Sequence, residues 1–471
     1  MNKQLPVTFL FWCALMPSLH AQITYDVEAL DAGPLSYVTP GTYPVQVTVR
    51  NNNIDYYVPV LTASWQLDGG DVHSCPINQF LIYGYYLYPT FSDRFTHTDS
   101  VSLTTVGTHS FKAWTSMPGN QPDPNPSNDT VSITIHVVDS LPEKKMVVYY
   151  GTHTQCFPCG TYGEPQLEGI LDSFPNSAYV ITAHDGLADP FNTEDGGDIN
   201  DTYFWPFTGH PAFVYDQFKF PFFFSIVPYT FGAEWLGGRW RLDYRTPVQV
   251  KLEKVIMDSV TRKISGEVHT RFFADYSADL TVNVTIVEDS VWGEQDGAPG
   301  GYIYHRYVLR DMTDGIAGVE GIIPPSASAG DEFIYEFQDS VGADVNVKNI
   351  YIVGYVQEND ADPLKREIVN TDEVRVADFA VATATENNGV HEISIHVFPN
   401  PAKDHFFIVA DMQIEDGQFE LTDILGETIL KGNLESRNEK VTLHDLPPGL
   451  YFLQVESLTF PKKRVKVIVT E

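Results

Sequence analysis

Two cysteines three residues apart, Cys156 and Cys159, separate two apolar patterns of different period, and this stretch constrains the fold more than any other. The apolar run at residues 146–150 predicts a buried strand before them. After them, apolar residues recur at the spacing of one helix face: Leu167, Ile170, Leu171 and Phe174. A strand, a short loop, a Cys-x-x-Cys pair and a helix is the context in which such a pair carries out redox chemistry.

The helix predicts different roles for the two thiols. Unpaired N–H groups and the positive end of the helix dipole favour a thiolate at Cys156, so we expect it to be the nucleophile and the more exposed thiol. Cys159 lies one turn deeper and would be the resolving thiol. An alternative is a zinc or copper site made of His153, Cys156, Cys159 and His184. The spacing and the lack of a second cysteine pair favour the redox interpretation.

A second apolar run follows at residues 178–183, and Gly209-His-Pro211 then opens a third. Proline is tolerated at the head of a strand where its missing N–H is not needed. This order resembles the thioredoxin fold. The resemblance implies that Pro211 belongs to a cis-proline loop beside the cysteines and positions the substrate, and we expect no cofactor.

Three features depart from the thioredoxin pattern. Gln155 stands where a tryptophan usually precedes the first cysteine, and no acidic residue is obvious as the buried proton acceptor. Pro165 is expected to break or kink the helix early, because it lacks an N–H and its ring crowds the preceding turn.

The insertion at residues 184–206 is rich in Asp, Gly and Asn, and we expect it to be a loop.

Residues 145–375 also resemble the outer membrane protein 28-related secreted family of Bacteroidetes, which places a thioredoxin-like unit and an appended β-sandwich in one chain. Besides the cysteine pair, three short motifs carry the likeness: Tyr304-His-Arg-Tyr-Val-Leu-Arg310, Tyr351-Ile-Val-Gly-Tyr-Val-Gln357 and Ile368-Val-Asn370. We expect the thioredoxin-like unit at 145–245 and the sandwich at 246–379. His305, Arg306 and Arg310 are interpreted as residues of a half-exposed strand, since no acid or nucleophile clusters with them in sequence.

The start of the chain reads as a secretion signal. A lysine, an apolar core over residues 7–15 and a small-residue site ending at Ala21 predict a signal peptide at residues 1–21. Of the four cysteines only Cys13 lies in it, which leaves three in an oxidising compartment. No segment reaches membrane-spanning length. The net charge of −33 argues against a nucleic-acid partner.

Residues 22–140 alternate apolar and polar side chains between turns, which predicts a β-sandwich. The stretches 47–51, 107–114 and 123–130 resemble bacterial cell-adhesion-related Ig-like domains. Asp123, Asn125, Asn128 and Asp129 offer hard oxygens for Ca²⁺. The alternative, which we favour, is a polar turn whose side chains cap their own backbone. Cys75 is interpreted as a small buried apolar residue.

The C-terminus carries the most specific signal. After a small, polar linker at residues 380–392, residues 393–471 resemble the type A C-terminal sorting domain of type IX secretion. The likeness rests on Val397-Phe-Pro-Asn-Pro-Ala-Lys-Asp404, Leu421-Thr-Asp-Ile-Leu-Gly426 and Leu446-Pro-Pro-Gly-Leu-Tyr-Phe-Leu453. It implies that the type IX machinery exports the protein to the outer membrane surface or the medium.

With 471 residues, several domains are expected. We predict a mostly β, multidomain chain in which Ig-like sandwiches flank an α/β thioredoxin-like domain and a β-sandwich sorting domain follows. The leading function is thiol–disulfide exchange with extracytoplasmic protein thiols and disulfides through Cys156, Cys159 and Pro211. The alternative is a non-enzymatic surface or adhesion-type protein with a structural Cys156–Cys159 disulfide.

Overall fold

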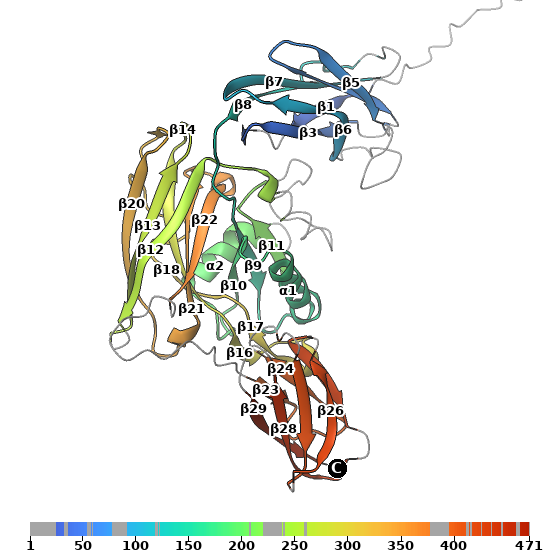
Figure 1. Cartoon of the computed structure of the whole chain (residues 1–471), viewed down its shortest axis with the longest axis vertical. Coiled ribbons are helices and arrows are strands. Elements are labelled where there is room, and N and C mark those ends of the chain that lie inside the picture. Colours follow the sequence, from blue (N-terminus) through green and yellow to red (C-terminus); the bar gives the residue numbers. More distant parts are fainter. Residues whose placement is uncertain are drawn as a thin grey trace, which may run out of the picture.

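The computed structural model describes residues 25–376 and 395–470, apart from gaps at 33–35, 54–57, 59, 78–91, 118–120, 122, 207–208, 220–237, 239–240, 259–260, 411–413, 415–416, 425, 435, 444–445 and 458–461. The expected signal peptide and the linker at 380–392 lie outside the described residues. The described chain is mostly β. Its N-terminal sandwich and its C-terminal domain lie at opposite ends of an elongated molecule (Figure 1).

The N-terminal region is a sandwich of two sheets, as its alternating pattern predicts. One sheet has the order β1-β3-β6, and the other has the order β2-β8-β7-β4-β5. Their inner faces share a core that includes Val47, Leu61 and Phe111. The free Cys75 is buried on β5, as expected of a small apolar side chain. The strands are β1 (Val27–Asp31), β2 (Tyr37–Val38), β3 (Gly41–Asn51), β4 (Leu61–Leu67), β5 (Val72–Ile77), β6 (Ser92–Leu103), β7 (Gly107–Ser116) and β8 (Thr130–Val137).

A seven-stranded mixed sheet, ordered β11-β9-β10-β18-β15-β21-β22, forms the middle of the molecule. β9 and β10 are parallel, β11 runs antiparallel to β9, and β10 pairs in parallel with β18 where Thr182 meets Val308. Strands from both sides of the expected domain boundary at 245/246 therefore belong to one sheet and not to two separate sheets. The strands are β9 (Met146–Thr152), β10 (Ala178–His184), β11 (Ala212–Tyr215), β15 (Leu280–Glu288), β18 (Val308–Met312), β21 (Ile350–Glu358) and β22 (Ile368–Arg375).

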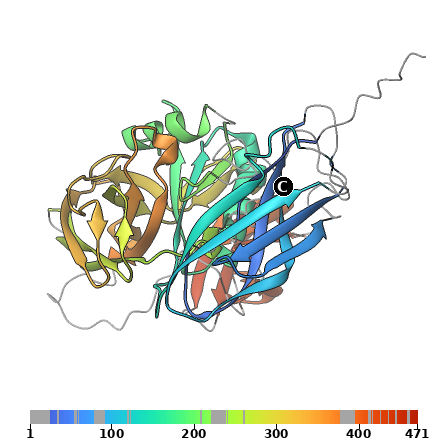
Figure 2. The same ribbon diagram turned by 90° about the horizontal axis from the view of Figure 1, so that it is seen from above.

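A second sheet, ordered β12-β13-β20, packs on the β15–β21–β22 part of this sheet through a core that includes Val268, Val284 and Ile352. This gives the predicted sandwich, although it shares a sheet with the region before it. In Figure 2 this sandwich lies to one side of the N-terminal sandwich and the C-terminal domain. Its strands are β12 (Val248–Asp258), β13 (Lys263–Phe272) and β20 (Glu332–Ser340). Two small ladders pair β14 (Tyr276–Ser277) with β19 (Ser326–Ala327) and β16 (Val291–Glu294) with β17 (Tyr302–His305).

Two helical segments follow β9 and β10. The first begins as a π-helical turn, η2 (Cys159–Gly163), and continues as α1 (Glu164–Ser173), which buries Leu167 and Ile170 as predicted. Pro165 does not break the helix: it occupies the first turn of α1, where its missing N–H matters least, and the wider π turn precedes it. The 184–206 insertion, expected to be a loop, contains α2 (Glu194–Ile199) and a π turn, η3 (Asn200–Phe204). Thr193 caps α2 through its side-chain oxygen, a signal present in the sequence.

The C-terminal domain is a smaller sandwich of a three-stranded sheet, β23-β24-β27, and a four-stranded sheet, β26-β25-β28-β29. Phe406, Leu421, Leu453 and Val467 are among its core residues. None of the helices in the described ranges has the length and apolar character needed to cross a bilayer. The strands are β23 (Ile395–Phe398), β24 (His405–Ala410), β25 (Gly417–Thr422), β26 (Thr428–Leu434), β27 (Asn438–Thr442), β28 (Gly449–Glu456) and β29 (Lys463–Val469).

Candidate functional site

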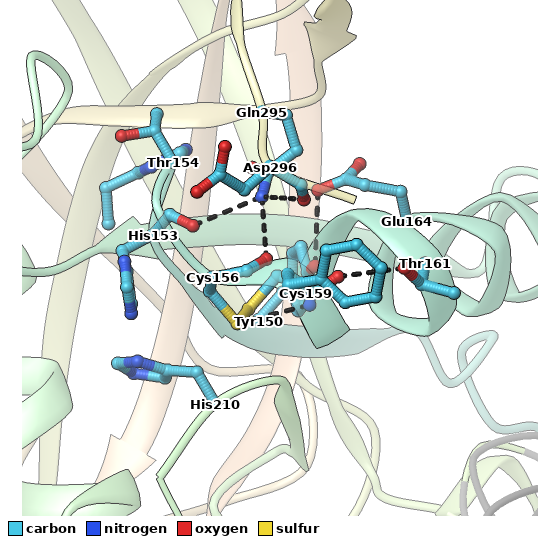
Figure 3. Close-up of a disulfide and its surroundings, with 12 residues drawn as sticks. Tyr150, His153, Thr154, Cys156, Cys159, Thr161, Glu164, His210, Gln295 and Asp296 are labelled. Carbon is cyan, nitrogen blue, oxygen red and sulfur yellow. Dashed lines mark hydrogen bonds between the residues drawn. A yellow bond between two sulfur atoms is a disulfide. The ribbon is translucent and has the colours of Figure 1, made fainter. Parts of the chain in front are cut away.

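Cys156 and Cys159 form a disulfide just beyond the C-terminal end of β9, with a Cα–Cα distance of 5.2 Å (Figure 3). Cys156 is 6% exposed and Cys159 is fully buried, so the predicted order of exposure is confirmed. The backbone N–H of Cys159 donates to Cys156 Sγ at 3.1 Å. Such a donor at the start of a helical segment would stabilise a thiolate on Cys156 after reduction.

Pro211 lies against the helical turn that follows the cysteines. The His210–Pro211 peptide bond is cis, as predicted. A Cβ placed on Gly163 would come within 2.8 Å of Pro211 Cβ, so this turn approaches the proline as closely as a glycine allows. The next residue, Ala212, pairs with Gly151 near the end of β9. The structure thus places Pro211 against the turn that begins at Cys159, at the same end of β9 as the disulfide.

His210 lies on the opposite side of the cysteine loop from the β16–β17 connection (Figure 3). Its ring centroid is 5.7 Å from that of His153, and its Nε2 donates to Asn200 Oδ1 at 2.5 Å. Its buried Nδ1 has no hydrogen-bond partner, and burial lowers the pKa of His210 to about 4. The side chain is therefore neutral at pH 7.

The β16–β17 connection holds the cysteine loop, and no local sequence pattern predicts this contact. The fully buried Gln295 donates from Nε2 to Cys156 O at 3.0 Å and to His153 O at 3.3 Å. Asp296 N donates to Thr154 O at 2.8 Å. A Cβ on Gly297, which has a φ of 82°, would meet Phe157 O at 2.1 Å, so only glycine fits this contact.

A buried polar cluster supports the loop from the side of β10. Asp189 Oδ2 accepts from Thr154 N at 2.7 Å and from His184 Nδ1 at 3.0 Å. The ring of His305 lies 5.0 Å from that of His184, centroid to centroid. Neither His184 Nε2 nor His305 Nδ1 has a hydrogen-bond partner.

The interpretation of His305 and Arg306 as half-exposed strand residues is wrong, whereas Arg310 is half-buried on β18 as expected. His305 and Arg306 are 1% and 5% exposed, because the parallel pairing of β18 with β10 carries this segment into the interior. Burial, together with His184, lowers the pKa of His305 to about 3. Arg306 is compensated by an ion pair with Asp289 and by a second one with Glu168 on α1.

Glu164 is an acidic residue that the sequence analysis missed. It begins α1, is half-buried, and accepts from the Tyr150 hydroxyl at 3.2 Å. Burial and, to a smaller degree, the neighbouring Glu168 raise the pKa of Glu164 to about 8. It lines a cleft of about 370 Å³ between α1, the β16–β17 segment and the C-terminal domain. Its position directly before Pro165, in a helix first turn, was the available signal.

Neither of the two metal sites considered above has a complete set of ligands. In the described part of the chain, no three His, Cys, Asp or Glu side chains are placed to hold an ion. At the cysteines, both sulfurs are in the disulfide. In the N-terminal turn, Asp123 Oδ1 accepts from Asn125 N and Asp123 Oδ2 from Val27 N. Asn128 Nδ2 donates to Asp26 Oδ1, while burial and Asp123 raise the pKa of Asp129 to about 7. These contacts fit the polar-turn interpretation.

Comparisons with known proteins identify the C-terminal domain. Residues 396–470 match the family model described as secretion system C-terminal sorting domain. The chain therefore carries a type IX sorting domain, whose partner is the type IX secretion machinery, and is exported to the cell surface or the extracellular space. A search of curated proteins found no significant match.

Three solved structures show distant likeness. HBP35 of Porphyromonas gingivalis is 16% identical with a TM-score of 0.42, over 70% of this chain and 99% of that one. A domain of the outer membrane lipoprotein Omp28 from Porphyromonas gingivalis is 17% identical with a TM-score of 0.19, over 28% and 88%. A CARDB domain from Pyrococcus furiosus is 15% identical with a TM-score of 0.18, over 24% and 90%.

Proposed function

We propose that this exported protein carries a thioredoxin-like unit and exchanges disulfides with extracytoplasmic proteins. The observation that carries the proposal is the convergence of Cys156, Cys159 and Pro211 at the C-terminal end of β9. A parallel β9–β10 pair, the helix α1 between them in sequence and the antiparallel β11 support the thioredoxin-like assignment. The motifs of residues 145–375 support membership of the outer membrane protein 28-related family.

The chemistry follows from the geometry. In the reduced protein, the Cys156 thiolate attacks one sulfur of a substrate disulfide, and the other substrate sulfur leaves as a thiolate. The Cys159 thiolate then attacks Cys156 Sγ, which releases the second substrate sulfur and restores the Cys156–Cys159 disulfide. The substrate gains the two electrons that the cysteine pair loses. The reverse sequence oxidises a substrate dithiol.

Trapping of the mixed disulfide tests this function. Cys159→Ser should accumulate covalent adducts of Cys156 with extracytoplasmic proteins, because the resolving thiol is missing. Cys156→Ser should accumulate none, since Cys159 is fully buried. Adducts are detected on non-reducing gels as bands that disappear on reduction. If neither variant forms adducts, the exchange function is wrong.

A structural disulfide in a non-enzymatic surface protein is the second candidate. It is favoured by the low exposure of Cys156 and by the fully buried Gln295 that holds its carbonyl. The reduction potential separates the two candidates: known exchange catalysts lie at about −120 to −270 mV, whereas structural disulfides lie below about −300 mV.

A further inference from the structure

The β16–β17 hairpin contacts two different parts of the molecule. Its connecting segment holds the cysteine loop through Gln295, Asp296 and Gly297, as described above. The hairpin itself is a two-stranded ladder that joins none of the larger sheets in the described chain. Two-stranded hairpins are marginally stable in water unless they pack against other elements. Its conformation therefore depends on what it packs against.

The other side of the hairpin packs against the sorting domain. The Trp292 ring stacks on His396 of β23, with centroids 4.7 Å apart and planes at 14°. The Tyr302 ring lies 5.0 Å from that of Phe398, the last residue of β23. Backbone and ring meet directly at Gly300, where an added Cβ would come within 2.6 Å of Phe398. Figure 1 shows β16 and β17 at the junction between the central sheet and β23.

An ion pair joins the sorting domain to the helix that follows the cysteines. Arg437 Nη1 lies 3.3 Å from Glu168 Oε1, and the same carboxylate also pairs with the buried Arg306 at 3.0 Å. Val409, Ala410 and Arg437 line one side of the cleft of about 370 Å³, and Gly160 and Glu164 line another. The sorting domain thus contacts both elements that hold the disulfide: the hairpin and α1.

We propose that docking of the sorting domain through His396, Phe398 and Arg437 keeps the hairpin closed on the cysteine loop and slows reduction of the Cys156–Cys159 disulfide. Separation of the sorting domain removes the aromatic contacts from one side of the hairpin. The hydrogen bonds of Gln295 and Asp296 to the loop then open more often, and the disulfide reacts faster with an external thiol. As regulation of exchange, this inference rests on the proposed function.

The test uses the full chain with the double variant His396→Ala/Phe398→Ala, which leaves the hairpin sequence unchanged. Dithiothreitol reduces the disulfide and is itself oxidised, and the freed thiols are counted by alkylation over time. We expect reduction to be at least threefold faster than in the unaltered chain. Arg437→Glu, which places like charges opposite Glu168, should act in the same direction.

Phe452→Ala and Arg464→Glu are the matched controls, because both residues lie in the other sheet of the sorting domain, where the Arg464 guanidinium covers the Phe452 ring. They should leave the reduction rate unchanged. Hydrogen exchange of residues 291–305 reports opening of the hairpin, and small-angle scattering reports release of the domain. If the domain is released and the reduction rate stays within twofold, the coupling is wrong.

Failure of this inference and failure of the proposed function give different results. Reduction by dithiothreitol requires no protein substrate, whereas the Cys159→Ser adducts do. Faster reduction without adducts would leave the coupling intact around a structural disulfide. Adducts with an unchanged reduction rate would leave exchange intact without control by the sorting domain.

Discussion

The two ends of strand β9 carry buried polar clusters of opposite character. At the N-terminal end, Asp216 Oδ1 accepts from Val147 N at 2.8 Å. Its Oδ2 accepts from Lys144 Nζ at 2.7 Å and from Arg241 Nε at 2.6 Å. At the C-terminal end, where β10 pairs with β9, the buried nitrogens His184 Nε2, His210 Nδ1 and His305 Nδ1 lack hydrogen-bond partners.

This difference distinguishes a cluster in which the buried polar groups are paired from one in which some are not. Buried polar atoms are normally paired, so a paired cluster is evidence for packing, whereas several orphaned atoms in one place need another explanation. Ligands of open α/β sheets bind outside the carboxyl ends of the strands. The cluster at the C-terminal end of β9 has both properties. We therefore attribute the Asp216 cluster to folding and propose that the histidine cluster belongs to the candidate site.

The largest effect on stability is expected at the N-terminal end of β9, where Asp216 pairs with two buried cations. Asp216→Ala would leave the buried cations Lys144 and Arg241 without this carboxylate, which costs about 3–5 kcal/mol when one partner of a buried ion pair is removed. The measurement is the free energy of unfolding in urea. Glu456→Ala, which removes an exposed ion pair with Lys462, should cost less than about 1 kcal/mol. Equal costs for the two variants would contradict the comparison.

A smaller, pH-dependent effect on stability is expected at the C-terminal end of β9, where the histidine nitrogens lack hydrogen-bond partners. Because His305 is buried neutral with a pKa of about 3, the unfolded chain binds a proton that the folded protein does not as the pH falls below about 6.5. The stability that the neutral His305 contributes is thus fully present above pH 6.5 and is lost as the pH falls toward 3. Between pH 7 and pH 5 the unaltered protein should lose about 2 kcal/mol more than His305→Gln, which cannot be protonated.

His109 provides a control of opposite sign, and urea unfolding at several pH values measures both residues. Its hydrogen bond with Asp68 raises the pKa of His109, so its contribution is present below pH 6.5 and is lost as the pH rises through the folded pKa. The His109→Gln difference should therefore run in the other direction. A His305→Gln curve parallel to that of the unaltered protein would show that His305 is protonated in the folded state.

Local pattern predicted the elements of this region, while its long-range contacts escaped prediction. The apolar run at 146–150 and the helix face from Leu167 to Phe174 correspond to β9 and α1, because each depends on residues close in sequence. Gln295 lies 139 residues from Cys156, and Asp216 lies 72 from Lys144. Nothing in the local sequence of these residues indicates their partners. The ring of His305 likewise packs against residues far away in the sequence, His184 on β10 and Phe191.

The smallest expected change in stability concerns Glu164, and its replacement should increase the free energy of unfolding. Its pKa of about 8 in the folded protein, against about 4.5 when unfolded, means that folding requires a proton at pH 7. Stability from this group is fully present below pH 4.5 and is lost as the pH rises through 8. Glu164→Gln keeps a hydrogen-bond acceptor for Tyr150 without this cost. At pH 7 the variant should be more stable by about 1–2 kcal/mol, after a discount for partial exposure.

The neighbouring Glu168 shows whether the gain is specific to an uncompensated carboxyl. Glu168 pairs with both Arg306 and Arg437, so Glu168→Gln should destabilise the protein at pH 7. Urea unfolding of both variants at pH 4.5 and pH 7 measures the contrast: the Glu164→Gln gain should disappear at the lower pH. A loss at pH 7 for both variants would mean that Glu164 is ionised and stabilising, and the C-terminal end of β9 would then resemble the Asp216 end more closely than the geometry indicates.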